Sequence, residues 1–97
     1  MNRALGMLGL CARAGKLVSG EEMCVKAIRK GRVMLALLDE TASHNARKTI
    51  TDACAAANVP LYTLPEGQLG QAIGKPNRMA VGIEDPSFAA QLIKLFS

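Results

Sequence analysis

The chain has 97 residues, of which 49% are hydrophobic and 21% are charged. This length predicts one compact domain over residues 1–97 and excludes a second folded unit, because domains commonly run to about 100 to 200 residues. The apolar fraction is sufficient for a buried core, which excludes an intrinsically disordered chain.

The positive charge lies in the first third of the chain. Residues 1–32 carry seven basic and two acidic residues, whereas residues 33–97 carry five basic and six acidic ones, within a net charge of +4. Such an asymmetry fits an ordinary solvated face and also fits a surface that binds a polyanion. Charge alone does not decide between these two interpretations.

The cysteines and the apolar segments indicate the cellular compartment of the protein and whether it associates with membranes. Cys11, Cys24 and Cys54 are odd in number and lack Cys-x-x-Cys spacing, so we expect no disulfide framework, no metal and no cofactor. They are expected to be small buried hydrophobes in a reducing compartment. The apolar run 4–12 has no small-x-small cleavage site, and no run approaches the about 20 residues of a membrane span. The sequence therefore predicts a soluble, cytoplasmic protein that does not associate with membranes.

The first third of the chain predicts two helices separated by a short extended segment. Apolar periodicity predicts a helix over residues 2–14, and residues 16–18 are extended. Ser19 and Glu22 have the spacing of a capping box, in which the hydroxyl caps a backbone N–H and the carboxylate reaches back. This predicts a second helix over residues 19–31.

The middle of the chain predicts two strands and the helix between them. The continuous apolar run 33–38 is typical of a strand that is buried on both faces, so it is the candidate for the centre of the sheet. Residues 43–58 have helical apolar spacing, with Ser43 as the expected N-cap and Asn58 as the expected C-terminal stop. Residues 59–64 are predicted as a strand, in which the early proline indicates a strand start or a sheet edge.

The last third predicts two further helices and one strand. A short helix is expected over residues 66–73, and alternating apolar residues predict a strand over residues 79–83. Asp85 followed by Pro86 predicts the start of a last helix. Strands separated by helices of this length predict an α/β sandwich.

The residues that could support catalysis do not form a recognisable pattern. The segment 70–75 resembles part of a phosphate loop, but Leu69 and Pro76 stand where glycine and a hydroxyl residue are required. His44 lies beside Ser43 and two acidic residues within one strand-to-helix junction, whereas a nucleophile, base and orienter converge from separate elements. The sequence therefore predicts that the protein is not an enzyme.

The predicted second helix has one charged face. Its charged positions fall at i, i+4, i+7 and i+8: Glu22, Lys26, Arg29 and Lys30. One interpretation is a solvated surface. In the other, the helix N-terminus faces a phosphate or a base edge while the cations hold the nucleic-acid backbone, and Gly20 allows the close approach. Periodicity does not separate the two.

Five segments, in order along the chain, carry a resemblance to a known family. They are Arg13 to Gly20, Lys26 to Ile28, Val33 to Leu38, Val59 to Tyr62 and Leu69 to Lys75. In these segments the chain resembles the superfamily of ribosomal proteins L7Ae and L30e. Its length and its Ser19-Gly20-Glu21-Glu22 helix start are most similar to the small bacterial members. The resemblance implies a three-layer α-β-α sandwich with a four-stranded mixed sheet, and RNA binding as the function.

The resemblance also implies where RNA binds. Family members recognise kink-turns, which are sharply bent RNA internal loops with tandem sheared G·A pairs. They use the N-terminus of the second helix and the loop before the short fourth helix. On this chain the implied residues are Lys16, Gly20, Glu21, Glu22, Lys26, Arg29 and Lys30, together with the loop residues Leu64, Pro65, Glu66, Gly67 and Gln68. Lys26 matches the base-contacting lysine of the family, and the apolar loop residues would cover splayed bases.

Two alternatives stay open at this point. Glu22 and Met23 stand where archaeal members have Asn and Glu, and Glu22 either completes the capping box or contacts a base. We expect a monomer that binds a kink-turn or another element of ribosomal RNA. The alternative is a protein-interaction module that engages ribosomal or translation-related proteins through the same helix face and the 64–68 loop.

Overall fold

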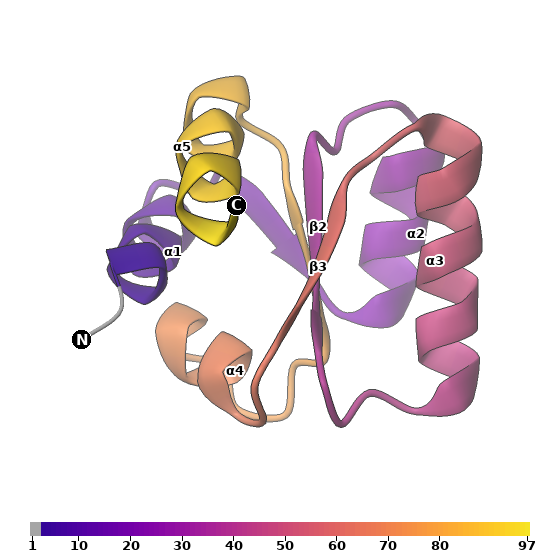
Figure 1. The fold of residues 1–97 in the computed structure, drawn as a ribbon, viewed down its shortest axis with the longest axis horizontal. Coiled ribbons are helices and arrows are strands. Elements are labelled where there is room, and N and C mark those ends of the chain that lie inside the picture. Colours follow the sequence, from indigo (N-terminus) through magenta and orange to yellow (C-terminus); the bar gives the residue numbers. More distant parts are fainter. Residues whose placement is uncertain (1–2) are drawn as a thin grey trace.

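The computed structural model describes residues 3–97, in which helices and strands alternate (Figure 1). The elements are α1 (Arg3–Arg13), β1 (Leu17–Ser19), α2 (Glu21–Arg29), β2 (Leu35–Asp39), α3 (His44–Ala57), β3 (Leu61–Leu64), α4 (Gln68–Ile73), β4 (Ala80–Ile83) and α5 (Pro86–Phe96). The predicted type and order of these elements are confirmed, with boundaries that differ by no more than two residues. The predicted helix start at residue 2 lies outside the described residues.

The strands form one mixed sheet in the order β1-β4-β2-β3. β2 pairs in parallel with β3 and antiparallel with β4, and β4 pairs antiparallel with β1. The three strands β1, β2 and β3 therefore run in one direction, and β4 runs in the other. Because of these directions, the carboxyl ends of β1, β2 and β3 lie at the same end of the sheet as the amino end of β4.

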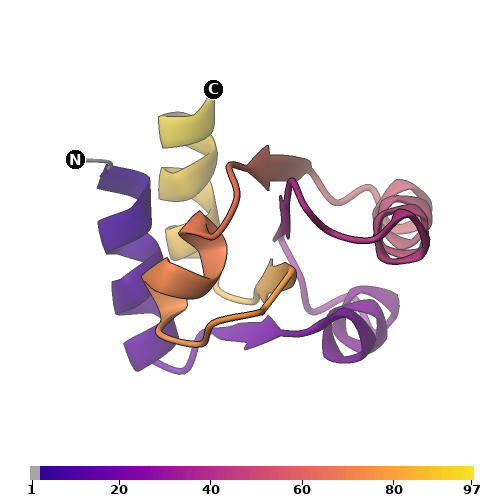
Figure 2. The same ribbon diagram turned by 90° about the horizontal axis from the view of Figure 1, so that it is seen from below.

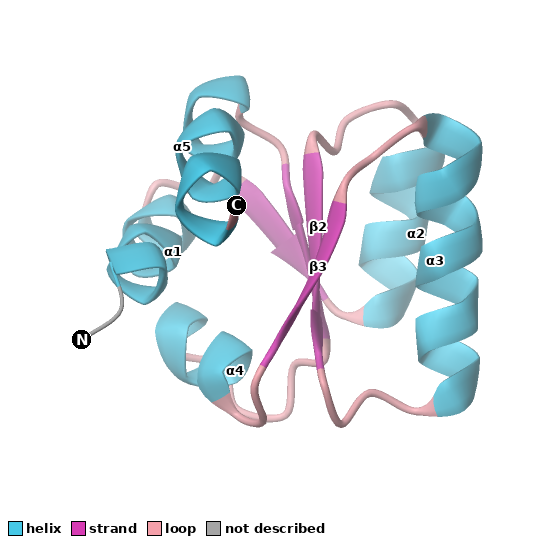
Figure 3. Cartoon of the chain, viewed as in Figure 1, coloured by secondary structure: helices cyan, strands magenta, loops and turns pink. Residues whose placement is uncertain are grey.

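Helices cover both faces of the sheet. α2 and α3 lie on one side, and α1, α4 and α5 lie on the other, as Figures 1 and 3 show edge-on. Each side has its own cluster of buried apolar residues against the sheet. The interior strands β2 and β4 are buried along their whole length, as predicted for the apolar run that became β2. The predicted three-layer α-β-α sandwich with a four-stranded mixed sheet is confirmed.

Several helix ends have the caps that the sequence predicts. The Ser43 hydroxyl accepts a hydrogen bond from the N–H of Ala46 at 3.1 Å at the start of α3. Asn58 ends α3 in the left-handed region, and the Asp85 carboxylate caps α5 ahead of Pro86. These caps are local signals, which is why they could be recognised in the sequence.

The three cysteines are buried and unpaired. Cys11 belongs to the cluster beneath α1, α4 and α5, whereas Cys24 and Cys54 belong to the cluster beneath α2 and α3. Burial raises the pKa of Cys11 to about 11 and that of Cys24 to about 12. Within residues 3–97, no helix combines the length and the apolar character needed to cross a membrane.

Candidate nucleic-acid interface

Four connections meet at the end of the sheet where β1, β2 and β3 end and β4 begins. They are the turn at Gly20 and the segments 40–43, 65–67 and 74–79. This end lies at the bottom of Figure 1 and faces the viewer in Figure 2. Strand direction alone brings these segments together, although up to about sixty residues of chain separate them.

The turn from β1 into α2 depends on Gly20. Its backbone has φ +97° and ψ 147°, a region that is essentially restricted to glycine, and its N–H donates to the oxygen of Ala80 at 2.9 Å. Ser19 is paired with Val81 in the sheet, so its side chain does not turn toward the helix start. α2 begins without a side-chain cap, and the capping box predicted from Ser19 and Glu22 is therefore wrong.

The charged face of α2 extends from this end of the molecule to the opposite one. Glu21 and Glu22 are exposed in the first turn, beside uncapped N–H groups and the positive end of the helix dipole. Lys26 is exposed further along the helix. Arg29 and Lys30 are exposed at the far end, about 12 Å from the first residue at 1.5 Å per residue. Only the first three of these side chains lie near the Gly20 turn.

Two other predicted site residues, Lys16 and Leu64, do not contribute side chains to the surface around the Gly20 turn. Lys16 precedes β1, where its oxygen accepts the N–H of Glu84, so about 13 Å of extended chain separates it from Gly20. Leu64 is the last residue of β3 and is only 5% exposed, within the core beneath α1, α4 and α5. The expectation that the Leu64 side chain covers a base is wrong, because the side chain belongs to the core.

Carboxylates at the end of β2 hold the 64–68 loop. Asp39 is 1% exposed, and its Oδ1 accepts the N–H of Gly67 at 2.8 Å. Its Oδ2 accepts both the N–H and the hydroxyl of Thr41. The neighbouring Glu40 Oε2 accepts the N–H of Glu66 at 2.8 Å. The loop backbone is therefore fixed from the sheet, while Pro65, Glu66 and Gly67 remain exposed.

The ionisation of Asp39 follows from these bonds. Burial by itself raises the pKa of this carboxyl, but the hydrogen bonds from the Thr41 hydroxyl and from two backbone N–H groups outweigh burial. They hold the pKa of Asp39 below its ordinary value, so the carboxylate stays charged at neutral pH. All the hydrogen bonds that the Asp39 carboxylate accepts come from the loop backbone or from Thr41, so Asp39 is a positioning residue.

The 74–79 segment contains candidate site residues that the sequence prediction missed. It folds back onto α4, since a Cβ on Gly70 would lie 2.9 Å from the oxygen of Lys75. At its other end, Arg78 Nη1 lies 3.1 Å from the position that a Cβ on Gly20 would occupy. The Arg78 guanidinium therefore lies against the turn that starts α2, and both Lys75 and Arg78 are exposed cations.

Arg78 connects the start of α2 with the 64–68 loop. One cavity, of about 730 Å³, lies between α1, β1, α2 and α4, and its lining includes Arg13, Met23, Lys75 and Arg78. A second cavity, of about 570 Å³, is lined by both Glu66 and Arg78. The Met23 side chain is 54% exposed. Because Arg78 lines both cavities, the surface is continuous from the start of α2 to the 64–68 loop.

Residues 3–93 match the Ribosomal protein L7Ae/L30e/S12e/Gadd45 family. The chain belongs to this family, which confirms the resemblance predicted from its motifs. It is 46% identical over 91 residues to the RNA-binding protein YlxQ of Bacillus subtilis (strain 168), an alignment that covers 92% of this chain and 90% of that protein. It is 36% identical over 94 residues to the RNA-binding protein YlxQ of Enterococcus faecium, covering 96% and 90%. The predicted similarity to small bacterial members is thereby confirmed.

Solved structures confirm the fold. A protein of unknown function from Bacillus halodurans C is 36% identical, with a TM-score of 0.93 over 98% of this chain and 97% of that one. The 15.5kD RNA binding protein of Giardia lamblia is 17% identical, with a TM-score of 0.75 over 93% and 81%. Both curated relatives are named for RNA binding, which supports the prediction of a non-enzymatic protein.

Proposed function

We propose that this chain is a non-enzymatic RNA-binding protein that recognises a kink-turn or a similarly bent element of ribosomal RNA, acting as a cytoplasmic monomer with one domain over residues 1–97. The main support is the convergence of the uncapped start of α2 with Arg78, in a family whose relatives are named for RNA binding. The proposed contact residues are Gly20, Glu21, Glu22, Lys26, Pro65, Glu66, Gly67, Gln68, Lys75 and Arg78.

Each part of this surface suits a different part of a bent RNA. The N–H groups at the start of α2 and the guanidinium of Arg78 suit phosphates, since both donate several hydrogen bonds to oxygen. Glu21 and Glu22 can accept hydrogen bonds from the amino and imino groups of an exposed guanine edge. Gly20 has no side chain to hold the RNA away from the backbone. With the capping box absent, the Glu22 carboxylate is available for a base.

The aromatic residues support this mode over one that depends on ring stacking. Tyr62 and Phe96 stack on each other with ring centroids 5.3 Å apart, and Phe88 packs against the same core. All three rings are half-buried in the α1, α4 and α5 layer. Proteins that bind single-stranded RNA by stacking need exposed rings. Recognition by shape and by unstacked bases fits this chain better, because an RNA duplex has a major groove too narrow for side chains.

The direct test compares two labelled RNAs by fluorescence anisotropy. One is a kink-turn, and the other is the same RNA with its G·A pairs replaced by Watson–Crick pairs. The proposal predicts at least about tenfold tighter binding to the kink-turn, and a loss of that preference in Lys26→Ala, since each good base contact contributes about 1 to 3 kcal/mol. Equally weak binding to both RNAs would contradict kink-turn recognition.

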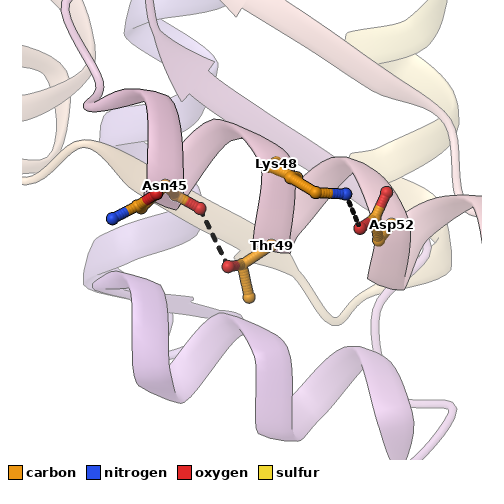
Figure 4. Close-up of polar contacts among 4 residues, drawn as sticks. All are labelled: Asn45, Lys48, Thr49 and Asp52. Carbon is orange, nitrogen blue, oxygen red and sulfur yellow. Dashed lines mark hydrogen bonds and ion pairs between the residues drawn. The ribbon is translucent and has the colours of Figure 1, made fainter.

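The salt dependence tests the cations separately. If Lys75 and Arg78 contact phosphates, log affinity should fall with log salt at a slope of roughly −1 to −2. Arg78→Ala should make this slope shallower by about one. Lys48 on α3 is a matched control, because its Nζ already pairs with Asp52 Oδ2 at 2.9 Å (Figure 4). Lys48→Ala should leave affinity and slope unchanged, and an equal effect of both variants would argue against the Arg78 surface.

A further inference from the structure

A second surface lies between α1 and α5, on the side of these helices that faces away from the sheet. The two helices pack side by side and run in opposite directions, so the start of α1 and the end of α5 lie at the same end of the molecule (Figure 2). Between them is a groove of about 720 Å³. Its apolar lining is Met7, Leu10 and Leu95, and its cations are Arg3, Arg13 and Lys94. We call it the α1–α5 groove.

The apolar lining is unusually exposed. Leu10 is 54% exposed and Leu95 is 38% exposed, and these are two of the four large hydrophobic side chains exposed in the described part of the chain. A single exposed leucine is ordinary on a protein surface. Two leucines that come from separate helices and line one groove form a contiguous apolar patch, which is typical of a binding surface.

Gly6 on α1 adds an independent observation. It is an exposed residue inside a helix, its backbone lies outside the left-handed region, and a Cβ built on it would meet nothing within 4 Å. Glycine destabilises a helix interior relative to alanine, and no contact within the described residues requires it here. The missing side chain does, however, widen the groove, so that the backbone of a partner can approach α1 closely.

The charged side chains that line the groove are all basic. The segments Arg3–Arg13 and Pro86–Phe96 contain no Asp or Glu. Arg3 and Arg13 are ten residues apart on α1, which is about 15 Å along the helix axis. Lys94 lies near the end of α5, and therefore at the same end of the groove as Arg3. A segment with carboxylates at both ends complements this arrangement.

We propose that the α1–α5 groove docks an acidic amphipathic helix of a partner protein. A helix of about eleven residues spans the 15 Å between the cations. Its apolar face, with residues at i, i+3 or i+4 and i+7, would contact Met7, Leu10 and Leu95 over the open floor at Gly6. Its acidic residues would pair with Arg3 and Lys94 at one end and with Arg13 at the other.

The lining favours protein over nucleic acid as the occupant. Leucine and methionine side chains offer no hydrogen-bond partners to base edges, and no aromatic ring lines the groove. The groove is also separate from the candidate nucleic-acid interface, except that Arg13 lines both the groove and the cavity beside α2. The test therefore leaves Arg13 unchanged.

The test begins with an unbiased selection. A phage-displayed library of random 16-residue peptides is selected on the full-length protein and depleted on the Leu10→Asp/Leu95→Asp variant. We expect the selected peptides to converge on helical sequences with apolar residues at i, i+3 or i+4 and i+7, and with Asp or Glu at their ends. Failure to converge, or convergence on basic peptides, would overturn the proposal.

A synthetic copy of the best peptide then locates the site. Its amide shift changes in the protein's NMR spectrum should be confined to α1 and α5. Its affinity should fall at least tenfold in Leu10→Asp/Leu95→Asp and also in Arg3→Glu/Lys94→Glu, which alters the charge without removing a leucine. Met34→Asp is the matched control, because Met34 is 38% exposed like Leu95 but lies before β2. Spectral dispersion verifies that each variant is folded.

Two further measurements distinguish a partner helix from two other occupants, a second copy of the chain and RNA. Sedimentation of the free protein should show no self-association that depends on Leu10 and Leu95, since such an association would assign the groove to a second copy. Binding of kink-turn RNA should leave the amides of residues 3–7 and of α5 unshifted, because the end of α1 also borders the candidate interface. Leu10→Asp/Leu95→Asp should keep its RNA affinity. RNA-induced shifts in residues 3–7 or in α5 would assign the groove to nucleic acid and overturn the proposal.

Discussion

The candidate nucleic-acid interface and the α1–α5 groove are built in opposite ways. The interface consists of connections from distant parts of the chain, held by Asp39 and by the glycine turn at Gly20. The groove consists of two regular helices whose packing on the sheet already fixes its shape. A surface made of loops needs dedicated positioning bonds, whereas a surface made of helices needs only its two elements. Substitutions should therefore affect the two surfaces differently.

The largest expected effect is at Asp39, which only the interface needs. Asp39→Ala removes the buried acceptor for the N–H groups of Thr41 and Gly67. It should lower the free energy of unfolding by about 3 kcal/mol, because each hydrogen bond to a charged group contributes about 1.5 to 3 kcal/mol. Urea denaturation measures the loss. Thr41→Val removes the hydroxyl alone and should cost about 1 kcal/mol. Equal stability of Asp39→Ala and the wild type would contradict the positioning role.

The next effect concerns Gly20, which belongs to the interface and not to the α1–α5 groove. Gly20→Ala forces alanine into a region that costs about 1 to 3 kcal/mol and brings its Cβ to 3.1 Å from Arg78. We expect a loss of about 2 kcal/mol in the free energy of unfolding and weaker RNA binding in the anisotropy assay. Peptide binding in the α1–α5 groove should not change. If the variant binds RNA with unchanged affinity although its stability falls, the proposal that RNA approaches the backbone at Gly20 is contradicted.

A smaller effect depends on pH. The pKa of Asp39 is lowered in the folded state, below the about 3.9 of an unfolded aspartate, so its contribution to stability is complete above that value. The contribution is lost as the pH falls through the lower folded value. Denaturation curves between pH 6 and about pH 2 should show this loss in the wild type. Asp39→Asn should have a flatter profile, and an unchanged slope would contradict the assignment.

The smallest effect has the opposite sign. Gly6→Ala fills open space on α1 and should raise the free energy of unfolding by about 0.5 to 1 kcal/mol, which thermal or urea denaturation can detect. The same methyl group narrows the α1–α5 groove and should weaken the selected peptide. RNA binding should not change. A more stable variant with unaltered peptide affinity would show that Gly6 plays no part in docking.

Elements that depend on local signals could be predicted from the sequence. The apolar run at β2, the Ser43 cap, the left-handed Asn58 and the Asp85–Pro86 helix start each depend on a few neighbouring residues. The family resemblance added the layer order and the sheet. These features account for the correct fold.

The features that could not be predicted depend on contacts across the sheet. Ser19 has the sequence of a cap, but pairing with Val81 holds it in β1. Leu64 ends the predicted strand 59–64, but the family resemblance placed it in the RNA-binding loop, and the packing of β3 buries it. Arg78 precedes β4, and only the antiparallel direction of that strand brings it beside Gly20. Strand direction and pairing are not encoded in local spacing, and they decided these three positions.

Buried cysteines lie on both sides of the sheet and can report on each layer separately. Cys11 is on the buried face of α1, which borders the α1–α5 groove, and Cys24 is on the buried face of α2, in the same layer as Cys54. With their pKa values raised to about 11 and about 12, both thiols stay protonated and unreactive while the layers are closed. The rate at which a thiol reagent labels each one therefore measures how often that layer opens. Single-cysteine variants would show whether the two layers open together or whether each ligand closes only its own side.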